Sequence, residues 1–522
     1  MSMSSSIFVI VLFLLLSGTV PANAEALEMR RTTVVILGAG ASGISAALTL
    51  QEKGISDFII VDAQSFIGGR VQHEDFDGKT VELGANWKNL VYFDQEGGQL
   101  PTGTGHNVSA LFDETMETMV EFAGLRMKRN QVDLSSRTAL QLMGWSPDTP
   151  LKAAVEYFGV NWELAEPAEM SSLDYATGTV DTVSGSFPNG NDFVVDDRGF
   201  NFILEREART ILADDDPRLL LNTLVTDILY DDYDKVTILT ANGTTIVADH
   251  GICTFSLGVL QNQQVKFTPE LPEWKREALL SFHMTTYTKI FVKFAQDNFW
   301  GDWEFALYAS NNTRYGGDYT VWQNIAATRT SSYQNHPSSH SSDTHNVLMV
   351  TTTYKESEKV EIKTDQQVKE EIHRVLQHMF PHIQVPYPTD ILIPRWRQNP
   401  LFHGSYSNWP IGMSLQHHEN MRAPLPLHPT QHPRLWFAGE AMSQKYYGYL
   451  HGAWLNGQEV GRVVGNCLTQ SKCHHPYRYH PIVTGCSNAV QEKTQRRSMA
   501  RRFPPKEPEK SASQKQKAFA PY

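Results

Sequence analysis

Cysteine is scarce in this sequence, with four residues among 522. Their positions have no metal-site spacing, so we expect no bound metal. An even number of cysteines suits an oxidising compartment, where disulfide bonds persist. Cys253 follows an apolar, strand-like stretch and is expected to be a buried thiol. Two of the other three could pair, in a connectivity that the sequence does not determine: Cys467, Cys473 and Cys486.

Basic residues are outnumbered by acidic ones outside one segment. Residues 487–522 hold nine Lys and Arg and three Glu, a charge of +6, so the rest of the chain carries −18 within the total of −12. An acidic body argues against nucleic acid as the main partner and would attract a cationic substrate. An equally good explanation is that the negative charge serves only to keep the protein soluble. We expect the polar, basic tail to be disordered, and three alternatives stay open for it: binding to cell-wall polyanions, vacuolar sorting, or no role.

Long apolar runs are absent except near the N-terminus. Ile7–Leu16 is followed by the A-x-A pattern of Ala22–Ala24, so residues 1–24 are predicted to be a signal peptide, too short to span a membrane, although no Lys or Arg precedes the apolar core. Three glycosylation sequons agree with a secreted, extracellular protein without a membrane span: Asn107, Asn242 and Asn311.

What is present is a strong local motif at Thr33–Gly43, TVVILGAGASG. An apolar strand leads into G-x-G-x-x-G, and small and apolar residues at helical spacing follow it. Such glycines permit a sharp turn, close approach to a pyrophosphate and tight helix packing. A second apolar strand, Phe58–Val61, ends at Asp62, where an acidic residue would bind a ribose. The context predicts a dinucleotide site.

The remaining pattern is that of a large α/β protein without internal repeats, long enough for two domains. Strands are expected at Leu220–Ile228, Thr286–Phe294 and Asn346–Thr353. Helices are expected at Ala110–Ala123, after a polar loop over Asp94–Gly105, and at Asp365–Met379 and Tyr449–Asn466.

Several separate stretches, taken together and in this order, are similar to the motifs of one protein family: GAGASGISAA, IGGR, VELGANW, ELAEP, SLGVLQ, YTKIFVKF, PRW, GSYSNWPIG, FAGEA and YGYLHGAW. From about Thr33 to Cys473, the chain resembles the FAD-dependent amine oxidases, above all the secreted plant-type polyamine oxidases. The resemblance implies an α/β fold with a Rossmann-like FAD-binding domain of discontinuous segments (25–105, 190–279 and 395–472). An α+β substrate-binding domain would comprise residues 106–189 and 280–394.

The resemblance also implies a non-covalent FAD site. By similarity, the pyrophosphate would be held by Gly38, Gly40, Ser42 and Gly43. Asp62, where the family more often has Glu, would bind ribose, and Arg70 would contact phosphate. Val225 would line the adenine. The flavin and its ribityl end would be contacted by Gly84, Ala85, Trp87, Trp396, Gly439, Glu440 and Tyr449.

For catalysis, the resemblance points to Lys289, which would hold a water beside the flavin, although a lysine in an alternating strand is ordinarily solvated. Tyr406 and Tyr449 would sandwich the substrate through their π faces, where the alternative is ordinary aromatic core. Further substrate contacts would come from Tyr287 and from Glu166, the latter as an anchor for a distal ammonium. Asn89 would also contact the substrate, at a position that is usually acidic in the family, where an amide can accept a hydrogen bond from an ammonium but supplies no counter-charge.

The implied activity is oxidation of a secondary amine of spermidine or spermine by O₂, giving an aminoaldehyde, an amine and H₂O₂, in a monomeric enzyme. Terminal cleavage would release 1,3-diaminopropane. Two alternatives stay open: a back-converting oxidase that regenerates spermidine, and a non-catalytic flavoprotein of the same fold. A monoamine oxidase with covalent flavin is disfavoured because Tyr447–Tyr449 contains no cysteine.

Overall fold

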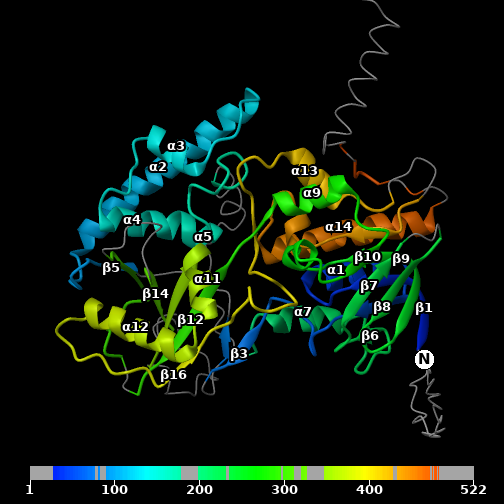
Figure 1. Ribbon diagram of the computed structural model, residues 1–522, viewed down its shortest axis with the longest axis horizontal. Coiled ribbons are helices and arrows are strands. Elements are labelled where there is room, and N and C mark those ends of the chain that lie inside the picture. The colour runs from blue at the N-terminus through cyan, green and yellow to red at the C-terminus, as the bar shows by residue number, and fades with distance from the viewer. Residues whose placement is uncertain are drawn as a thin grey trace, which may run out of the picture.

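Two β-sheets, each with its own helices, form two lobes that lie side by side (Figure 1). The computed structural model describes residues 28–76, 80–82, 90–177, 198–230, 234–295, 298–310, 319–325, 346–426, 432–470, 473, 475–478 and 480. The expected signal peptide and basic tail lie outside these residues, as do four of the expected site residues: Gly84, Ala85, Trp87 and Asn89.

The sheet of the first lobe has eight strands within the described residues, in the order β10-β7-β8-β9-β1-β2-β6, with β18 also paired to β9. β1 is parallel to both β2 and β9, as expected for a dinucleotide-binding sheet, whereas β8 is antiparallel to β7 and β9. The strands are β1 (Met29–Leu37), β2 (Phe58–Val61), β6 (Leu219–Leu220), β7 (Val225–Leu229), β8 (Val236–Thr240), β9 (Thr245–Cys253), β10 (Lys266–Thr268) and β18 (Leu435–Phe437).

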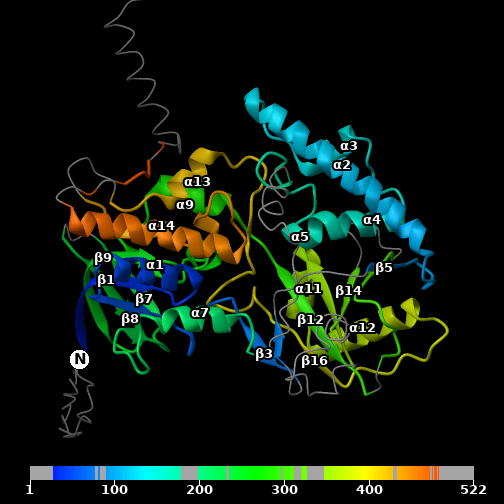
Figure 2. The same ribbon diagram turned by 180° about the vertical axis from the view of Figure 1, so that it is seen from behind.

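Both faces of β1 are covered, which explains its continuous apolar run. Val34 and Ile36 pack in one core cluster with α1 (Ala41–Glu52) and α14 (Leu450–Thr469), the helix pair beside this sheet in Figure 2. Val35 and Leu37 belong to another core cluster that also contains Phe282 and Trp409, so this core continues toward the second lobe. Among the described residues, the α-helices α7 (Asn201–Ala208), α8 (Leu257–Gln261), α9 (Glu273–Ser281) and α13 (Leu415–Arg422) also belong to the first lobe.

The second lobe is built on a sheet that has six strands among the described residues, in the order β16-β12-β15-β14-β13-β5. They are β5 (Leu90–Phe93), β12 (Tyr287–Lys293), β13 (Phe305–Tyr308), β14 (Val321–Asn324), β15 (Val347–Thr353) and β16 (Asp390–Leu392). Ile290 and Val292 of β12 pack against α11 (Tyr354–Ile362) and α12 (Asp365–Met379). α12 has the predicted bounds because its apolar stripe and its Thr364 capping box are both local signals.

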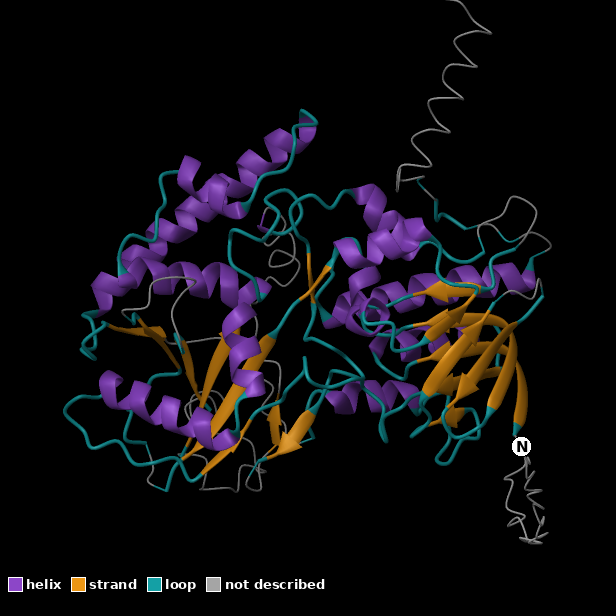
Figure 3. Cartoon of the chain, in the orientation of Figure 1, coloured by secondary structure: helices purple, strands orange, loops and turns teal. Residues whose placement is uncertain are grey.

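The opposite face of that sheet is covered by a succession of helices, seen in purple above the orange strands in Figure 3. They are α2 (Thr102–Lys128), α3 (Ser136–Leu142), α4 (Pro150–Glu156), the π-helix η1 (Tyr157–Asn161) and the single turn α5 (Trp162–Leu164). Phe158 and Trp162 contact Phe305 there. The expected polar loop over Asp94–Gly105 is shorter than predicted, because α2 already begins at Thr102.

Two other expectations differ from the structure. β5 falls inside the segment assigned to the FAD domain (25–105), yet it pairs in parallel with β13 of the second lobe. Leu220–Ile228 is not one strand: Asn222 has a φ of 51°, so the chain turns between β6, which pairs with β2, and β7, which pairs with β8. β13 and β2, the partners of β5 and β6, lie far away in the sequence, whereas β8 directly follows β7.

Antiparallel pairing of β11 (His283–Met284) with β17 (Ser407–Asn408) forms a small ladder where the chain passes between the lobes. β3 (His73–Asp75) and β4 (Thr80–Glu82) pair with each other in an antiparallel ladder. Cys467 and Cys473 form a disulfide bond and Cys253 is a buried thiol. Across the described residues, no helix combines the length and apolarity needed to cross a bilayer.

Candidate active site

A cavity of about 910 Å³ lies at the carboxyl end of β1 and extends toward the second lobe. Its walls come from segments that are far apart in the sequence. The expected site residues that line it are Gly38, Gly40, Ser42, Asp62, Arg70, Val225, Tyr287, Lys289, Trp396, Tyr406, Gly439, Glu440 and Tyr449. Gly43 and Glu166 are not among the lining residues.

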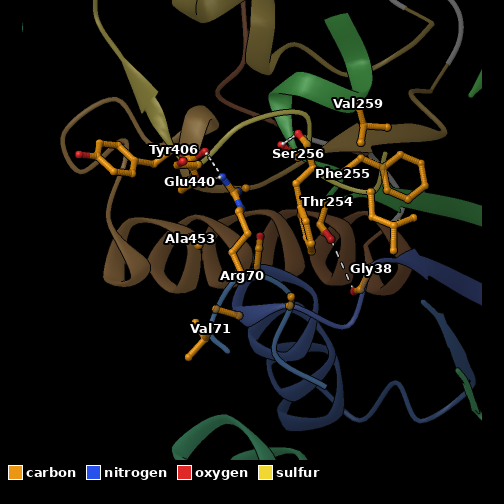
Figure 4. A pocket seen from close by; sticks show the side chains of 18 of the residues that line it. Gly38, Arg70, Val71, Thr254, Phe255, Ser256, Val259, Tyr406, Glu440 and Ala453 are labelled. Atoms are coloured by element: carbon orange, nitrogen blue, oxygen red, sulfur yellow. Dashed lines mark hydrogen bonds and ion pairs between the residues drawn. The ribbon is translucent and has the colours of Figure 1, made fainter. Parts of the chain in front are cut away.

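The glycine turn is shaped by close approaches of backbone. Gly38 has a φ of 116°, and a Cβ there would meet the Thr254 hydroxyl at 2.4 Å; Figure 4 shows these two residues in contact. A Cβ on Gly43 would lie 1.9 Å from the Gly38 carbonyl oxygen, so this glycine packs the helix on the strand instead of facing the cavity. The Ser42 hydroxyl, in the first turn of α1, is buried and has no hydrogen-bond partner in the described structure.

Asp62 directly follows β2 and lines the cavity, and its carboxylate also holds the glycine turn. Oδ2 accepts a hydrogen bond from Ala39 N at 2.6 Å, and Oδ1 accepts one from Gln64 N at 2.7 Å. Burial raises the pKa of Asp62, and the two backbone hydrogen bonds act against that rise. The carboxylate therefore connects β2 to the glycine turn.

Arg70 and Glu440 meet across the cavity wall, as Figure 4 shows. Arg70 Nη1 donates to Glu440 Oε1 at 3.1 Å and to the Ser405 carbonyl at 2.7 Å. Glu440, which begins the short helix η4 (Glu440–Met442), also accepts from the Ser407 hydroxyl at 2.5 Å and from Gly448 N at 2.8 Å. This network ties three distant segments together beside the glycine turn.

At the other end of the cavity, aromatic side chains surround a carboxylate that the sequence analysis did not select. Tyr449 donates its hydroxyl to Glu163 Oε1 at 2.5 Å, and Tyr406 donates to the Glu163 carbonyl at 3.0 Å. The Tyr287 ring lies 5.6 Å from that of Tyr406 and 6.1 Å from that of Trp162. Burial raises the pKa of Glu163, opposed by the hydrogen bond from Tyr449.

Glu166, the carboxylate expected to anchor substrate, lies elsewhere. Its Oε1 is 2.8 Å from His283 Nδ1, and its Oε2 accepts from Asn408 Nδ2 at 2.8 Å. Ala165 has a φ of 58°, so the chain reverses after α5 and directs the two acids of ELAEP to different surroundings. The motif contained both acids, but only the backbone conformation distinguishes them. Of these two acids, Glu163 is the one that lines the cavity.

Lys289 is 3% exposed and lines the cavity together with Tyr287 and Trp396. It lies on β12, in register with Thr351 of β15, and β16 pairs with the same strand further along, at Phe291–Lys293. Its burial excludes the ordinary alternative of a solvated lysine on a strand.

These features fit a flavin dinucleotide. Glycine backbone and the Ser42 hydroxyl at the start of α1 offer donors for a pyrophosphate, and the cavity continues from Val225 at one end to Trp396 and Lys289 at the other. No cysteine belongs to the described residues that line it, in agreement with non-covalent binding.

Comparison with known proteins agrees with this geometry. Residues 41–90 and 96–464 match the family model described as flavin containing amine oxidoreductase. Polyamine oxidase 6 of Oryza sativa subsp. japonica is 35% identical over 487 residues, covering 85% of this chain and 93% of that protein. Polyamine oxidase 1 of Zea mays is 35% identical over 492 residues, covering 86% and 92%.

A solved structure shares the fold at lower identity. Wild-type putrescine oxidase bound to putrescine has a TM-score of 0.65 and 17% identity, covering 85% of this chain and all of that one. The predicted fold class and the predicted FAD cofactor are thereby confirmed. The chain belongs to the flavin-containing amine oxidoreductases and is an enzyme of that family.

Proposed function

We propose that this enzyme oxidises a secondary amine of spermidine or spermine. With O₂ and water, the products are an aminoaldehyde, an amine and H₂O₂. A flavin held in this cavity would supply the redox chemistry, namely removal of a hydride from the carbon beside the nitrogen and reduction of O₂. The chain has to bind the polycation, orient it and exclude bulk water.

The observation that carries this proposal is a carboxylate inside an aromatic slot. Tyr406 and Tyr449 both hydrogen-bond to Glu163, which fixes the two rings relative to the acid. Aromatic faces attract ammonium groups, and a carboxylate that is largely removed from water attracts them more strongly. A linear polyamine offers several ammonium groups on an apolar chain, which matches such a slot.

We assign the buried ammonium of Lys289 to holding a water molecule beside the reacting carbon. The side chain reaches the cavity from β12, whose backbone at Lys289 is paired with Thr351 of β15, which limits its motion. Two relatives named polyamine oxidase, each 35% identical to this chain, support the same substrate class.

Terminal cleavage, with 1,3-diaminopropane as a product, is the route that we propose. Spermidine and spermine are incubated separately with the purified enzyme, and the products are identified by chromatography. Release of 1,3-diaminopropane supports terminal cleavage, whereas spermidine plus 3-aminopropanal from spermine would show back-conversion. Absence of H₂O₂ with every polyamine, diamine and monoamine tested would favour a non-catalytic flavoprotein.

The reacting nitrogen has to be unprotonated to release a hydride, so kcat/KM should rise with pH until the amine or a site group titrates. A flat profile between about pH 5 and 9 would contradict this requirement.

We further propose that the enzyme is secreted and monomeric. The disulfide bond between Cys467 and Cys473 is typical of an oxidising compartment. Two sequon asparagines, Asn107 on α2 and Asn242 in the β8–β9 turn, are exposed and open to glycosylation. Expression with the native N-terminus, followed by immunodetection in the medium and light scattering, tests both statements.

A further inference from the structure

Glu361 is a buried acid outside the cavity, with 2% of its surface exposed. It lies in the last turn of α11, where the helix dipole disfavours a negative charge. A carboxylate in so costly a position requires specific hydrogen bonds. Glu361 has three: Oε1 accepts from the Thr288 hydroxyl at 2.8 Å, and Oε2 accepts from Arg397 N at 3.0 Å and from Gln398 N at 3.3 Å.

The donors are the sequence neighbours of two cavity residues. Thr288 precedes Lys289 on β12 and is itself fully buried on the opposite face of the sheet. Arg397 and Gln398 follow Trp396, which lines the same cavity as Lys289. One carboxylate thus holds the strand of the lysine and the loop of the tryptophan.

The residue that precedes Trp396 in the loop is also hydrogen-bonded to Glu361. Arg395, which precedes Trp396, donates from Nε to the Glu361 carbonyl at 3.1 Å. Its Nη2 reaches Asp365 Oδ1 at 2.6 Å. Trp396 lies between β16 and β17, outside any helix or strand, so no sheet ladder fixes its backbone. Instead, the residues on both sides of Trp396 are hydrogen-bonded to Glu361, and these bonds hold the backbone of the loop in place.

We infer that Glu361 is a positioning residue, whose carboxylate sets the placement of Lys289 relative to Trp396 in the flavin cavity. This rests on the family of the enzyme and not on which amine it oxidises. A misplacement of about 1 Å can reduce a rate roughly 100-fold, so the loss of one such bond should be measurable.

Other contacts keep α11 on the sheet when this carboxylate is altered. Val360 is fully buried in the apolar cluster of the second lobe, and the hydroxyls of Ser357 and Thr352 are 3.0 Å apart. Variants that change only the hydrogen bonds of Glu361 should therefore fold.

The experiment compares two variant pairs as FAD-loaded enzymes. Thr288→Val removes the donor with a side chain of similar shape, whereas Thr288→Ser retains it. Glu361→Gln removes the charge and one acceptor, whereas Glu356→Gln changes an acid on the same helix that pairs with Lys359. For each, we measure bound FAD per chain, the circular dichroism of the bound flavin without amine, and the rate of flavin reduction by the best amine substrate.

We expect Thr288→Val and Glu361→Gln to change the flavin dichroism and to lower the limiting reduction rate per bound flavin about tenfold or more. The amine concentration at half-maximal rate should change less than about threefold, and Thr288→Ser and Glu356→Gln should resemble the wild type. Wild-type dichroism and reduction rate per bound flavin in both altered variants would overturn the inference, including when FAD content or melting temperature falls.

Discussion

Two charged side chains in the cavity have different tasks, and single substitutions separate them. Lys289 is buried on the middle of a strand, whereas Glu163 is bonded to the tyrosines at the aromatic end. A group that acts on the reacting atoms changes kcat, and a group that holds a remote part of the substrate changes KM.

Lys289→Met should lower kcat about 100-fold or more, because it removes the ammonium that we assign to the water beside the reacting carbon. Bound FAD per chain should stay unchanged. Stopped-flow measurement of flavin reduction and reoxidation identifies the affected step. Lys293→Met, four residues along the same strand and outside the cavity lining, is the control. A rate within about twofold of the wild type would contradict the assignment.

Glu163→Gln retains an acceptor for Tyr449 but removes the negative charge. A hydrogen bond to a charged group contributes about 1.5–3 kcal/mol, so KM for a polyamine should rise about tenfold or more while kcat changes little. Steady-state kinetics with spermidine checks this. Glu166→Gln is the matched comparison, since its carboxylate contacts His283 and Asn408 instead. A larger KM effect from Glu166→Gln would reverse the assignment of the cavity carboxylate.

At the scale of elements, the cofactor site depends on how closely α14 approaches α1. A Cβ on Gly457 would lie 2.1 Å from the Ser42 carbonyl and 2.1 Å from the Ser45 hydroxyl. Both belong to the first turns of α1, which follow the glycine turn. The packing of one helix therefore sets the position of the other at the cavity.

Gly457→Ala should destabilise the enzyme by about 1–3 kcal/mol and weaken FAD binding, because backbone atoms have to move apart. Gly124→Ala on α2 is the control: nothing lies within 4 Å of its Cβ, and the greater helix propensity of alanine should stabilise the protein slightly. Melting temperatures and FAD titration of the apoprotein measure both. Equal effects of the two substitutions would disprove the close-packing explanation.

For the whole molecule, the contact of His283 with Glu166 joins the end of the α5 segment to the ladder that connects the lobes. Burial lowers the pKa of His283. The hydrogen bond to Glu166 and the negative charge of Glu166 together outweigh this effect, so the net shift of the pKa is upward. The neutral side chains of Asn408 and Ser171 complete the surroundings of the acid. A raised folded-state pKa means that protonated His283 stabilises the fold at low pH, and that this stabilisation is lost as pH rises through the folded pKa.

His283→Gln should therefore lower the melting temperature more at about pH 5.5 than at about pH 8.5, with a loss of roughly 1 kcal/mol at the lower pH. Calorimetry of the FAD-loaded wild type and variant at both pH values measures the difference. The double variant His283→Gln/Glu166→Gln should show the same pH dependence of the melting temperature as His283→Gln alone, because the ion pair is already lost in the single variant. An effect that grows toward high pH would have the wrong sign.

The sequence by itself determined the local elements of this protein. The strand, glycine turn and helix at Thr33–Gly43 and the capped helix Asp365–Met379 are specified by residues within a few positions of one another, and both have the predicted form. The family resemblance likewise selected Lys289, Trp396, Tyr406 and Tyr449, all of which the fold brings to one cavity.

Tertiary structure decided what depends on distant partners. Two features decide that Glu163, and not Glu166, faces the cavity. Ala165 has a positive φ, and Glu166 is hydrogen-bonded to His283 and Asn408, which lie more than 100 residues away in the sequence. The sheet that β5 joins depends in the same way on β13. The pairing of Cys467 with Cys473, although local, was one of several connectivities that the sequence allowed. A local pattern specifies periodicity and turns, whereas long-range contacts decide where each side chain points.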